Sequence, residues 1–215
     1  MIIAVVIPTY NEKNNIGRLL DDLFKEWFPK IPWACMHVVV VDDRSPDGTA
    51  EIVRSRKKHF STLHLLSKKK QGLGHAAITG IKYAIHDLEA DAVIEMDADF
   101  QHNPAVIHNL VLAFTQGADY VIGSRYTAGG DIHCDWSRFR KLISKYGNLF
   151  ARAFLDISSI NDFTSGFKLT RVKGVLDAID LDTLMELDQF AYRTKPLRGG
   201  SHPNIPSHPQ HFLTK

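Results

Sequence analysis

Short apolar runs alternate with amphipathic stretches along most of this chain. The clearest period lies in residues 16–27, where apolar side chains recur at spacings of three and four and form one stripe along a helix. Pro29 and Pro32 end this pattern. The run at residues 2–8 is wholly apolar up to its proline and has no positively charged segment before it, so it predicts a buried strand rather than a signal peptide.

The same alternation continues towards the C-terminal side. We predict further strands at 37–41, 63–66, 92–96, 120–123 and 166–170, and helices at 49–58, 74–88, after Asn103-Pro104, at 138–154 and at 172–179. Strands and helices in this order are typical of an α/β protein, in which helices cover both faces of a mostly parallel sheet. We therefore predict one α/β domain over residues 1–180.

Residues 181–215 are expected to form an irregular tail. The last 20 residues hold four of the nine prolines and three of the eleven histidines, with no hydrophobic period. Such a segment lacks the apolar face that would offset the entropy of ordering it.

Composition excludes several classes of protein. Hydrophobic residues make up 44% of the 215 positions and charged residues 23%, as in ordinary globular domains. Lysine and arginine number 26 against 24 acidic residues, which leaves no broad basic surface for nucleic acid. The two cysteines, Cys35 and Cys134, have no C-x-x-C spacing, so we expect a reducing compartment and no catalytic thiol.

Polar side chains gather where three of the predicted strands end. They are Tyr10, Asn11 and Glu12 after the first strand, Asp42 and Asp43 after the second, and Asp97, Asp99 and Gln101 after the fourth. Ligands of open parallel sheets bind at this edge. Acidic residues are also common in ordinary turns, but three such groups at one edge favour a binding site.

Asp97 and Asp99 are separated by one residue, so their side chains lie on the same side of an extended backbone. A pair of this kind can hold a hard cation such as Mg²⁺ or Mn²⁺, whose other ligands are waters and phosphate oxygens. An isolated D-x-D is frequent by chance, so the pair gains its meaning from the segments around it.

Several segments together carry a family resemblance. They are Val6-Ile7-Pro8-Thr9-Tyr10-Asn11-Glu12, Val40-Val41-Asp42-Asp43-Arg44-Ser45-Pro46-Asp47-Gly48-Thr49, Gly72-Leu73-Gly74, Met96-Asp97-Ala98-Asp99-Phe100-Gln101-His102, Gly123-Ser124-Arg125-Tyr126, Trp136 with Arg140-Lys141, and Thr164-Ser165-Gly166-Phe167. In this order they resemble the inverting family 2 glycosyltransferases with the GT-A fold, a Rossmann-like α/β fold, and within them the dolichyl- or polyprenyl-phosphate mannose synthases. The resemblance covers residues 2–179, and the Pro- and His-rich tail replaces the strand and basic loop with which the family continues.

The resemblance implies a role for each matching residue. Those matching nucleotide-sugar contacts are Pro8, Tyr10, Glu12, Val41, Asp43, Asp97 and Ala98. Asp99 and Gln101 match ligands of a Mg²⁺ or Mn²⁺ ion. Arg125 and Arg140 match residues that hold phosphates at the reacting centre, so the expected catalytic residues are Asp99, Arg125 and Arg140.

The implied reaction is transfer of mannose from GDP-mannose to dolichyl or polyprenyl phosphate, with inversion and with a divalent metal. Two alternatives remain open: a related transferase that uses another sugar nucleotide such as UDP-glucose, and a catalytically inactive nucleotide-binding subunit. The expected partners are the sugar nucleotide, the lipid phosphate and membrane-protein subunits, and no nucleic acid. No apolar stretch reaches the length of about 18 residues that a spanning helix needs, so the expected location is the cytoplasm or the cytoplasmic face of a membrane.

Other residues near these segments are expected to play ordinary roles. His102 is predicted not to contact substrate or metal, and His75 is predicted to be a surface helix residue. The run Lys68-Lys69-Lys70 is predicted to be a solvated face rather than a site for a diphosphate or an anionic membrane surface. Phe150, Phe154, Phe163 and Phe167 are expected in the core rather than in a lipid groove.

Overall fold

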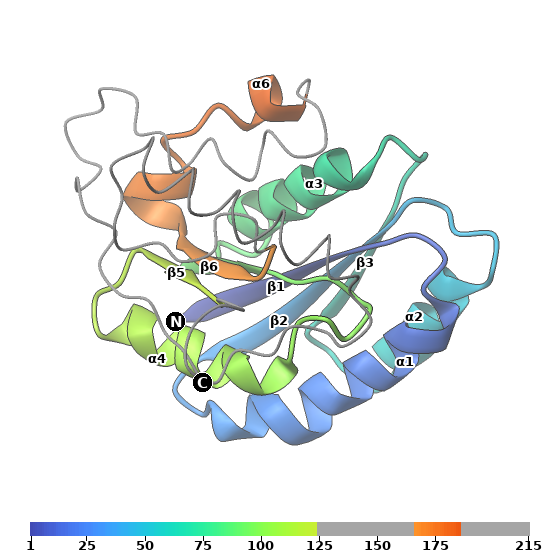
Figure 1. The fold of residues 1–215 in the computed structure, drawn as a ribbon, viewed down its shortest axis with the longest axis horizontal. Helices are drawn as coiled ribbons and strands as arrows, with labels where there is room; N and C mark the ends of the chain where they lie inside the picture. The colour runs from blue at the N-terminus through green and yellow to red at the C-terminus, as the bar shows by residue number, and fades with distance from the viewer. Residues whose placement is uncertain (124–165, 186–215) are drawn as a thin grey trace, which may run out of the picture.

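One six-stranded sheet organises the protein. The computed structural model describes residues 1–123 and 166–185, and in this part the strands lie in the order β3-β2-β1-β4-β6-β5 (Figure 1). The strands are β1 (Ile2–Thr9), β2 (Cys35–Asp42), β3 (Leu63–Ser67), β4 (Ala92–Glu95), β5 (Tyr120–Ile122) and β6 (Lys168–Arg171). The first four run parallel, and β6 is antiparallel to both of its neighbours. The predicted α/β fold with a mostly parallel sheet is confirmed.

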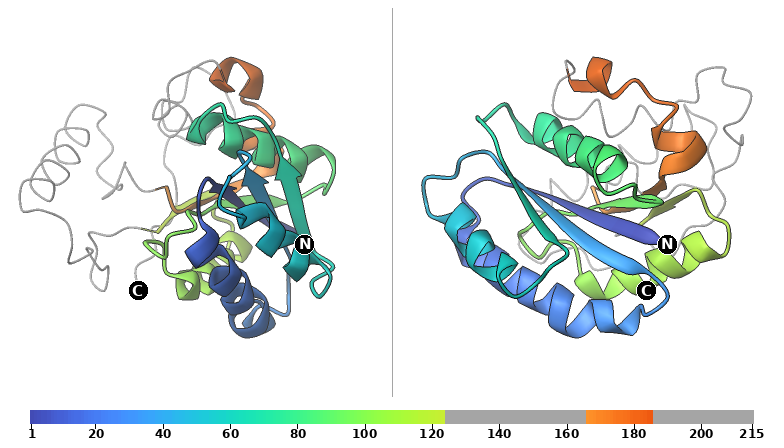
Figure 2. Two further views of the ribbon diagram at one scale, coloured as in Figure 1. Left: turned by 90° about the vertical axis from the view of Figure 1, so that its right-hand side faces the viewer. Right: turned by 180° about the vertical axis from the view of Figure 1, so that it is seen from behind.

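Helices cover both faces of this sheet (Figure 2). On one face lie α1 (Lys13–Asp22), α2 (Thr49–Lys57) and α4 (Ile107–Thr115), and on the other lie α3 (Leu73–His86) and α6 (Leu181–Met185). Alternate residues of β1 therefore enter two different cores, Val5 the first and Val6 the second. Burial on both faces explains why this strand is a continuous apolar run instead of an alternating one.

The first helix keeps its apolar stripe but changes its hydrogen bonding. Ile16, Leu19 and Leu20 are fully buried on α1. The helical path then continues as a π-helical turn at Leu23–Trp27 and a 3₁₀ turn at Phe28–Lys30. The chain is therefore helical over the predicted residues 16–27, with a change from α- to π-helical hydrogen bonding, and the helical segment ends in the region of Pro29 and Pro32 as predicted.

The predicted cap at Asn103 is confirmed. Its side-chain oxygen accepts the amide hydrogen of Ala105 at 3.0 Å, and Pro104 begins a 3₁₀ turn, Pro104–Val106, that leads into α4. Proline is suited to that position because it has no amide hydrogen to satisfy and its φ already matches a helix.

The antiparallel strand brings a buried ion pair into the sheet. Lys168 Nζ lies 3.1 Å from Glu95 Oε1, and the lysine side chain is only 2% exposed. Burial raises the pKa of the neighbouring Tyr120 phenol, and the charge of Glu95 raises it further. This pair joins β4 to β6 at the end of β4 from which the D-x-D segment continues.

The helix predicted at 172–179 is wrong. Val172–Leu176 forms one wide turn with non-helical backbone at Lys173 and at Gly174, whose φ is 82°. Glycine adopts this left-handed conformation without a steric penalty, so the chain turns there instead of continuing as a helix.

Part of the predicted irregular tail is also helical. Helix α6 packs on α3 with Leu181 and Leu184 buried, and its start is capped by Asp180, which accepts the amide hydrogens of Asp182 and Thr183 at 3.1 Å each. The spacing Asp180-x-x-Thr183 is a capping signal that the sequence analysis did not use. The helix predicted at 138–154 and the rest of the predicted tail lie outside the described residues.

None of the helices in the two described ranges is both long enough and apolar enough to cross a bilayer.

Candidate functional site

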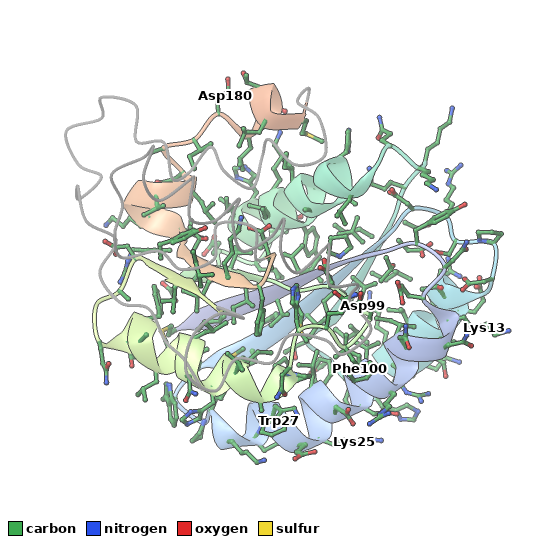
Figure 3. All side chains as sticks on the ribbon, viewed as in Figure 1. Lys13, Lys25, Trp27, Asp99, Phe100 and Asp180 are labelled. Carbon is green, nitrogen blue, oxygen red and sulfur yellow. The ribbon has the colours of Figure 1, made fainter. Side chains whose placement is uncertain are left out.

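Three loops meet at the carboxyl ends of the parallel strands. Thr9 pairs with Asp42 across β1 and β2, and Val6 pairs with Glu95 across β1 and β4, so the segments after these strands emerge at one edge. Asp99, Phe100 and Lys13 are labelled in Figure 3, and the contact of Arg18 with the Phe100 ring places the segment after β4 against α1. The convergence predicted for the polar strand ends is therefore observed.

Three consecutive main-chain amides of the first loop donate to side chains of the second. We call these contacts the loop clasp: Asn11 to Ser45 Oγ, Glu12 to Thr49 Oγ1 and Lys13 to Asp47 Oδ2, each at 3.0 Å. The hydroxyl of Thr49 also donates to Asp47, and this hydrogen bond is the largest cause that lowers the pKa of the Asp47 carboxyl. The loop clasp fixes the segment of Tyr10 and Glu12 relative to the segment of Asp43.

Two of these loops hold the chain in left-handed conformations. Asn11 has a φ of 62° and Arg44 a φ of 52°. Residues other than glycine rarely adopt this region, and such strain gathers at ligand-binding sites where the surrounding contacts enforce it. The loop clasp supplies a contact of that kind at Asn11 and at Ser45, the residue after Arg44.

A buried carboxylate with a basic partner lies beside this clasp. The Asp43 side chain is 5% exposed, and Lys68 Nζ lies 3.4 Å from its Oδ1. Lys70 Nζ lies 3.3 Å from the ring centroid of Tyr10, at cation–π distance. The prediction that the lysine run is only a solvated face is therefore wrong for Lys68, whose side chain is 15% exposed, because the strand register aligns Ser67 with Asp42 and brings the next residue onto Asp43.

The D-x-D segment turns sharply after its second aspartate. Phe100 has a φ of 62°, a conformation that costs about 1–3 kcal/mol for a side chain of this kind. The guanidinium of Arg18 lies 5.0 Å from its ring centroid. Within the turn, Asp99 accepts hydrogen bonds from the Gln101 amide at 3.0 Å and from Gln101 Nε2 at 2.7 Å. The turn thus brings the two predicted metal ligands into contact.

This donor set fits a hard divalent cation. Asp99 is half-buried, Gln101 is exposed, and together they offer carboxylate and amide oxygens, the ligands that Mg²⁺ and Mn²⁺ prefer. Within residues 1–123 and 166–185, no group of three or more His, Cys, Asp or Glu side chains is placed to hold a metal ion. Hard cations of this kind commonly complete their ligand sets with waters and phosphate oxygens.

His102 has a role that the sequence analysis did not identify. Its ring is buried, its Nδ1 accepts the main-chain amide hydrogen of Asp97 at 2.9 Å, and it stacks on Phe167. Phe167 is itself 3% exposed, which confirms its predicted place in the core. The feature of the sequence that could have indicated this role is the position of His102, three residues after Asp99.

The remaining predicted residues differ in what they present. Tyr10 is 41% exposed at the edge, and Glu12 and Pro8 are half-buried there. Val41 and Ala98 are buried in the two cores, so a nucleotide would meet them through the main chain. Arg125 and Arg140 lie outside the described residues.

The chain is similar in sequence to known mannosyltransferases over most of its length. The chain is 39% identical over 192 residues to the dolichol-phosphate mannosyltransferase of Pyrococcus furiosus, covering 87% of this chain and 52% of that protein. It is 37% identical over 189 residues to the undecaprenyl-phosphate mannosyltransferase of Micrococcus luteus, covering 86% of this chain and 72% of that protein. The chain thus spans between about half and seven tenths of the length of these relatives.

Solved structures show the same fold. A mannosyl-3-phosphoglycerate synthase from Rubrobacter xylanophilus matches with a TM-score of 0.58 at 18% identity, over 80% of this chain and 53% of that one. A mannosyltransferase from Pyrobaculum calidifontis, solved in complex with GDP-Man and Mn²⁺, matches with a TM-score of 0.53 at 20% identity, over 81% and 46%. The expected GT-A fold is confirmed. The model of glycosyl transferase family 2 matches residues 4–177, and this chain belongs to that family.

Proposed function

We propose that this chain is the glycosyltransferase domain of an enzyme that transfers mannose from GDP-mannose to a dolichyl or polyprenyl phosphate, with inversion and with Mg²⁺ or Mn²⁺. The observation that carries the proposal is the strained turn that joins Asp99 to Gln101 at the edge where the loop clasp lies. The names of the relatives at 37–39% identity favour mannose and a polyprenyl phosphate over other substrates.

The donor nucleotide fits the first two loops. Tyr10 has an exposed ring on which a base can stack, and the Asp43 carboxylate, paired with Lys68, is assigned to accept hydrogen bonds from a base. Glu12 lies next to them, its amide fixed by the loop clasp, and is assigned to the ribose together with Asp97. Because the loop clasp holds the main chain of Glu12 and Lys68 holds the Asp43 carboxylate, ordering these groups on binding costs less entropy.

The leaving diphosphate is assigned to Asp99 and Gln101. A cation held there would act as a Lewis acid on the charge that develops as the sugar–phosphate bond breaks. Arg125 and Arg140 are assigned to phosphates at the reacting centre, since a planar guanidinium binds phosphate through two parallel hydrogen bonds. The acceptor phosphate has a second pKa of about 6, so it attacks the anomeric carbon without a strong general base.

The acceptor implies a membrane surface. A polyprenyl phosphate presents its phosphate at the lipid–water boundary, so we place the reaction at the cytoplasmic face of a membrane. Membrane-protein subunits, or further parts of a longer chain, would hold the domain there.

Labelled transfer tests the proposal directly. The protein is incubated with GDP-mannose labelled in the sugar, Mn²⁺ and dolichyl phosphate, and the lipid is extracted; labelled lipid is the expected result. Label transferred only from UDP-glucose would replace the proposed donor. Nucleotide binding without transfer to any lipid phosphate would favour an inactive nucleotide-binding subunit.

A variant of the turn tests the metal role. Asp99→Asn keeps the shape of the side chain and removes its charge, so transfer should fall about a hundredfold to a thousandfold, as when other groups that stabilise transition-state charge are lost. Asp87→Asn is the matched control, because Asp87 is exposed at the far end of α3. Equal turnover in Asp99→Asn and in the control would remove Asp99 from the metal site.

A further inference from the structure

We infer that His102 is a positioning residue. Its ring holds the main chain of Asp97, and its stack on Phe167 connects Asp97 to Gly123 at the end of β5. We call the four groups, Asp97, His102, Phe167 and Gly123, the His102 column. The inference rests on the proposed function for its catalytic consequence, and its structural part stands on contacts among described residues.

The first contact fixes the start of the D-x-D segment. The amide of Met96, directly after β4, donates to the carbonyl of Val6 in β1 at 3.1 Å. The next amide, that of Asp97, donates to His102 Nδ1 at 2.9 Å. The main chain is thus held by β1 at Met96 and by the imidazole at Asp97, where the candidate site begins.

This contact also indicates which ring nitrogen of His102 carries the proton. An amide donor requires an unprotonated Nδ1, which places the proton of the neutral imidazole on Nε2. That nitrogen lies 3.7 Å from Asp97 Oδ2. One ring thus lies against both the main chain and the carboxylate of Asp97, and a purely apolar side chain cannot replace either contact.

The second contact joins His102 to another part of the sheet. The rings of His102 and Phe167 are 5.0 Å apart at an interplanar angle of 10°, within the range for stacked rings. Phe167 directly precedes β6, and its carbonyl accepts the amide hydrogen of Gly123 at 2.9 Å. The stack therefore connects the loop after β4 with the ends of β6 and β5.

Gly123 completes the column because it has no side chain. A Cβ at this position would lie 2.6 Å from Phe167 Cδ1, closer than atoms can approach. The backbone of Gly123 therefore lies directly on the phenyl ring. Ser124 and Arg125 follow Gly123 in the sequence. The His102 column therefore connects the D-x-D segment to the residue directly before the segment that is assigned to phosphate binding.

Two substitutions separate the two contacts of the ring. His102→Asn keeps an acceptor atom near the place of Nδ1 and loses the stack, whereas His102→Phe keeps the stack and loses the acceptor. Hydrogen–deuterium exchange of the Asp97 amide, measured on the protein without ligand, should be about tenfold faster in His102→Phe and close to wild type in His102→Asn, because the hydrogen bond to His102 Nδ1 protects that amide. His108→Asn is the control, since His108 packs on Trp33 from α4.

Ligand measurements then test the consequence for the site. We expect the affinity for GDP with Mn²⁺ to fall about tenfold in His102→Phe, from the loss of the same bond. In His102→Asn we expect kcat to fall more than nucleotide affinity, because the acceptor remains while the connection to Gly123 is lost. Gly123→Ala displaces Phe167 and should have the same effect as His102→Asn.

The outcomes are separable. Equal Asp97 exchange in His102→Phe and wild type would overturn the inference, as would equal loss of melting temperature and of exchange protection in both His102 variants, which indicates a packing role alone. If His102→Phe does not fold, unchanged kcat in both His102→Asn and Gly123→Ala overturns it. A wild-type protein that binds neither GDP nor UDP with Mn²⁺ contradicts the proposed function and leaves the exchange result to decide the inference.

Discussion

Gly80 lies where α3 packs against the side chains of β1 and β2 with no room for a Cβ, and replacing it with alanine should destabilise the protein. A Cβ built there lies 2.4 Å from Val6 Cγ1 and 3.0 Å from Val41 Cγ2, whereas ordinary contacts begin at 3.4 Å. Both neighbours are β-branched residues in central strands and have little rotamer freedom. The helix must therefore move away by roughly 1 Å, as close-packed cores adjust by shifting backbone.

The magnitude follows from two opposed terms. Overpacking a core costs about 1–3 kcal/mol, while glycine to alanine inside a helix gains about 1 kcal/mol. We expect Gly80→Ala to lower the free energy of unfolding by up to about 2 kcal/mol, which corresponds to a melting temperature lower by up to about 8 °C for a protein of this size. Thermal melts followed by circular dichroism, together with urea titration, measure both quantities.

Gly17 provides the matched control on α1. A Cβ there lies 3.1 Å from Ile52 Cγ2 and 3.7 Å from Arg56 Nη2, so a shift of a few tenths of an ångström accommodates it. Gly17→Ala should be neutral or stabilising by up to about 1 kcal/mol through helix propensity alone. A melting temperature of Gly80→Ala at or above wild type, or a loss in Gly17→Ala as large as in Gly80→Ala, would refute the reasoning.

Two further predictions concern pH and α6. Burial lowers the pKa of His37 and of His64 below 6.5, so below pH 6.5 the unfolded chain binds more protons than the folded chain, and the melting temperature should fall as the pH is lowered. The melting temperature of His37→Asn should depend less steeply on pH, and an equally steep dependence in this variant and in wild type would contradict the reasoning. Asp180→Ala removes the cap of α6 and should cost about 1 kcal/mol, seen as faster amide exchange at Leu181–Met185 than in an Asp87→Ala control.

The fold was predictable where one local pattern determines the structure. The run at residues 2–8 is buried on both faces, so its composition alone indicated a central strand. The direction of β6 was not predictable, because four residues carry no signal for parallel or antiparallel pairing. A lysine at the first position of β6 argued against burial, and Glu95, 73 positions earlier, supplies the charge that permits it.

The positions of the site residues were predictable from the sequence, whereas some of the contacts that support them were not. The sequence placed Asp43, Asp97, Asp99 and Gln101 at one edge, since strand ends follow from strand positions and all parallel strands end together. Two of the contacts that support these residues join segments distant in sequence: Lys68 lies on Asp43, and Phe167 stacks on His102, which in turn accepts the Asp97 amide. Such pairings depend on register and on side-chain geometry, which a hydrophobic pattern does not specify.

The loop clasp has a consequence for protein engineering. Lys13 is the first residue of α1, and Glu12 before it makes no capping hydrogen bond through its own side chain, so the start of that helix is capped by Asp47 from the second loop. The same carboxylate accepts the amide of Thr49, where α2 begins. Residues 43–49 therefore do not form an exchangeable cassette. A loop transplanted from a relative to change base preference must bring equivalents of Ser45, Asp47 and Thr49, or it will uncap two helices at once, whereas single substitutions at Asp43 leave both helix starts intact.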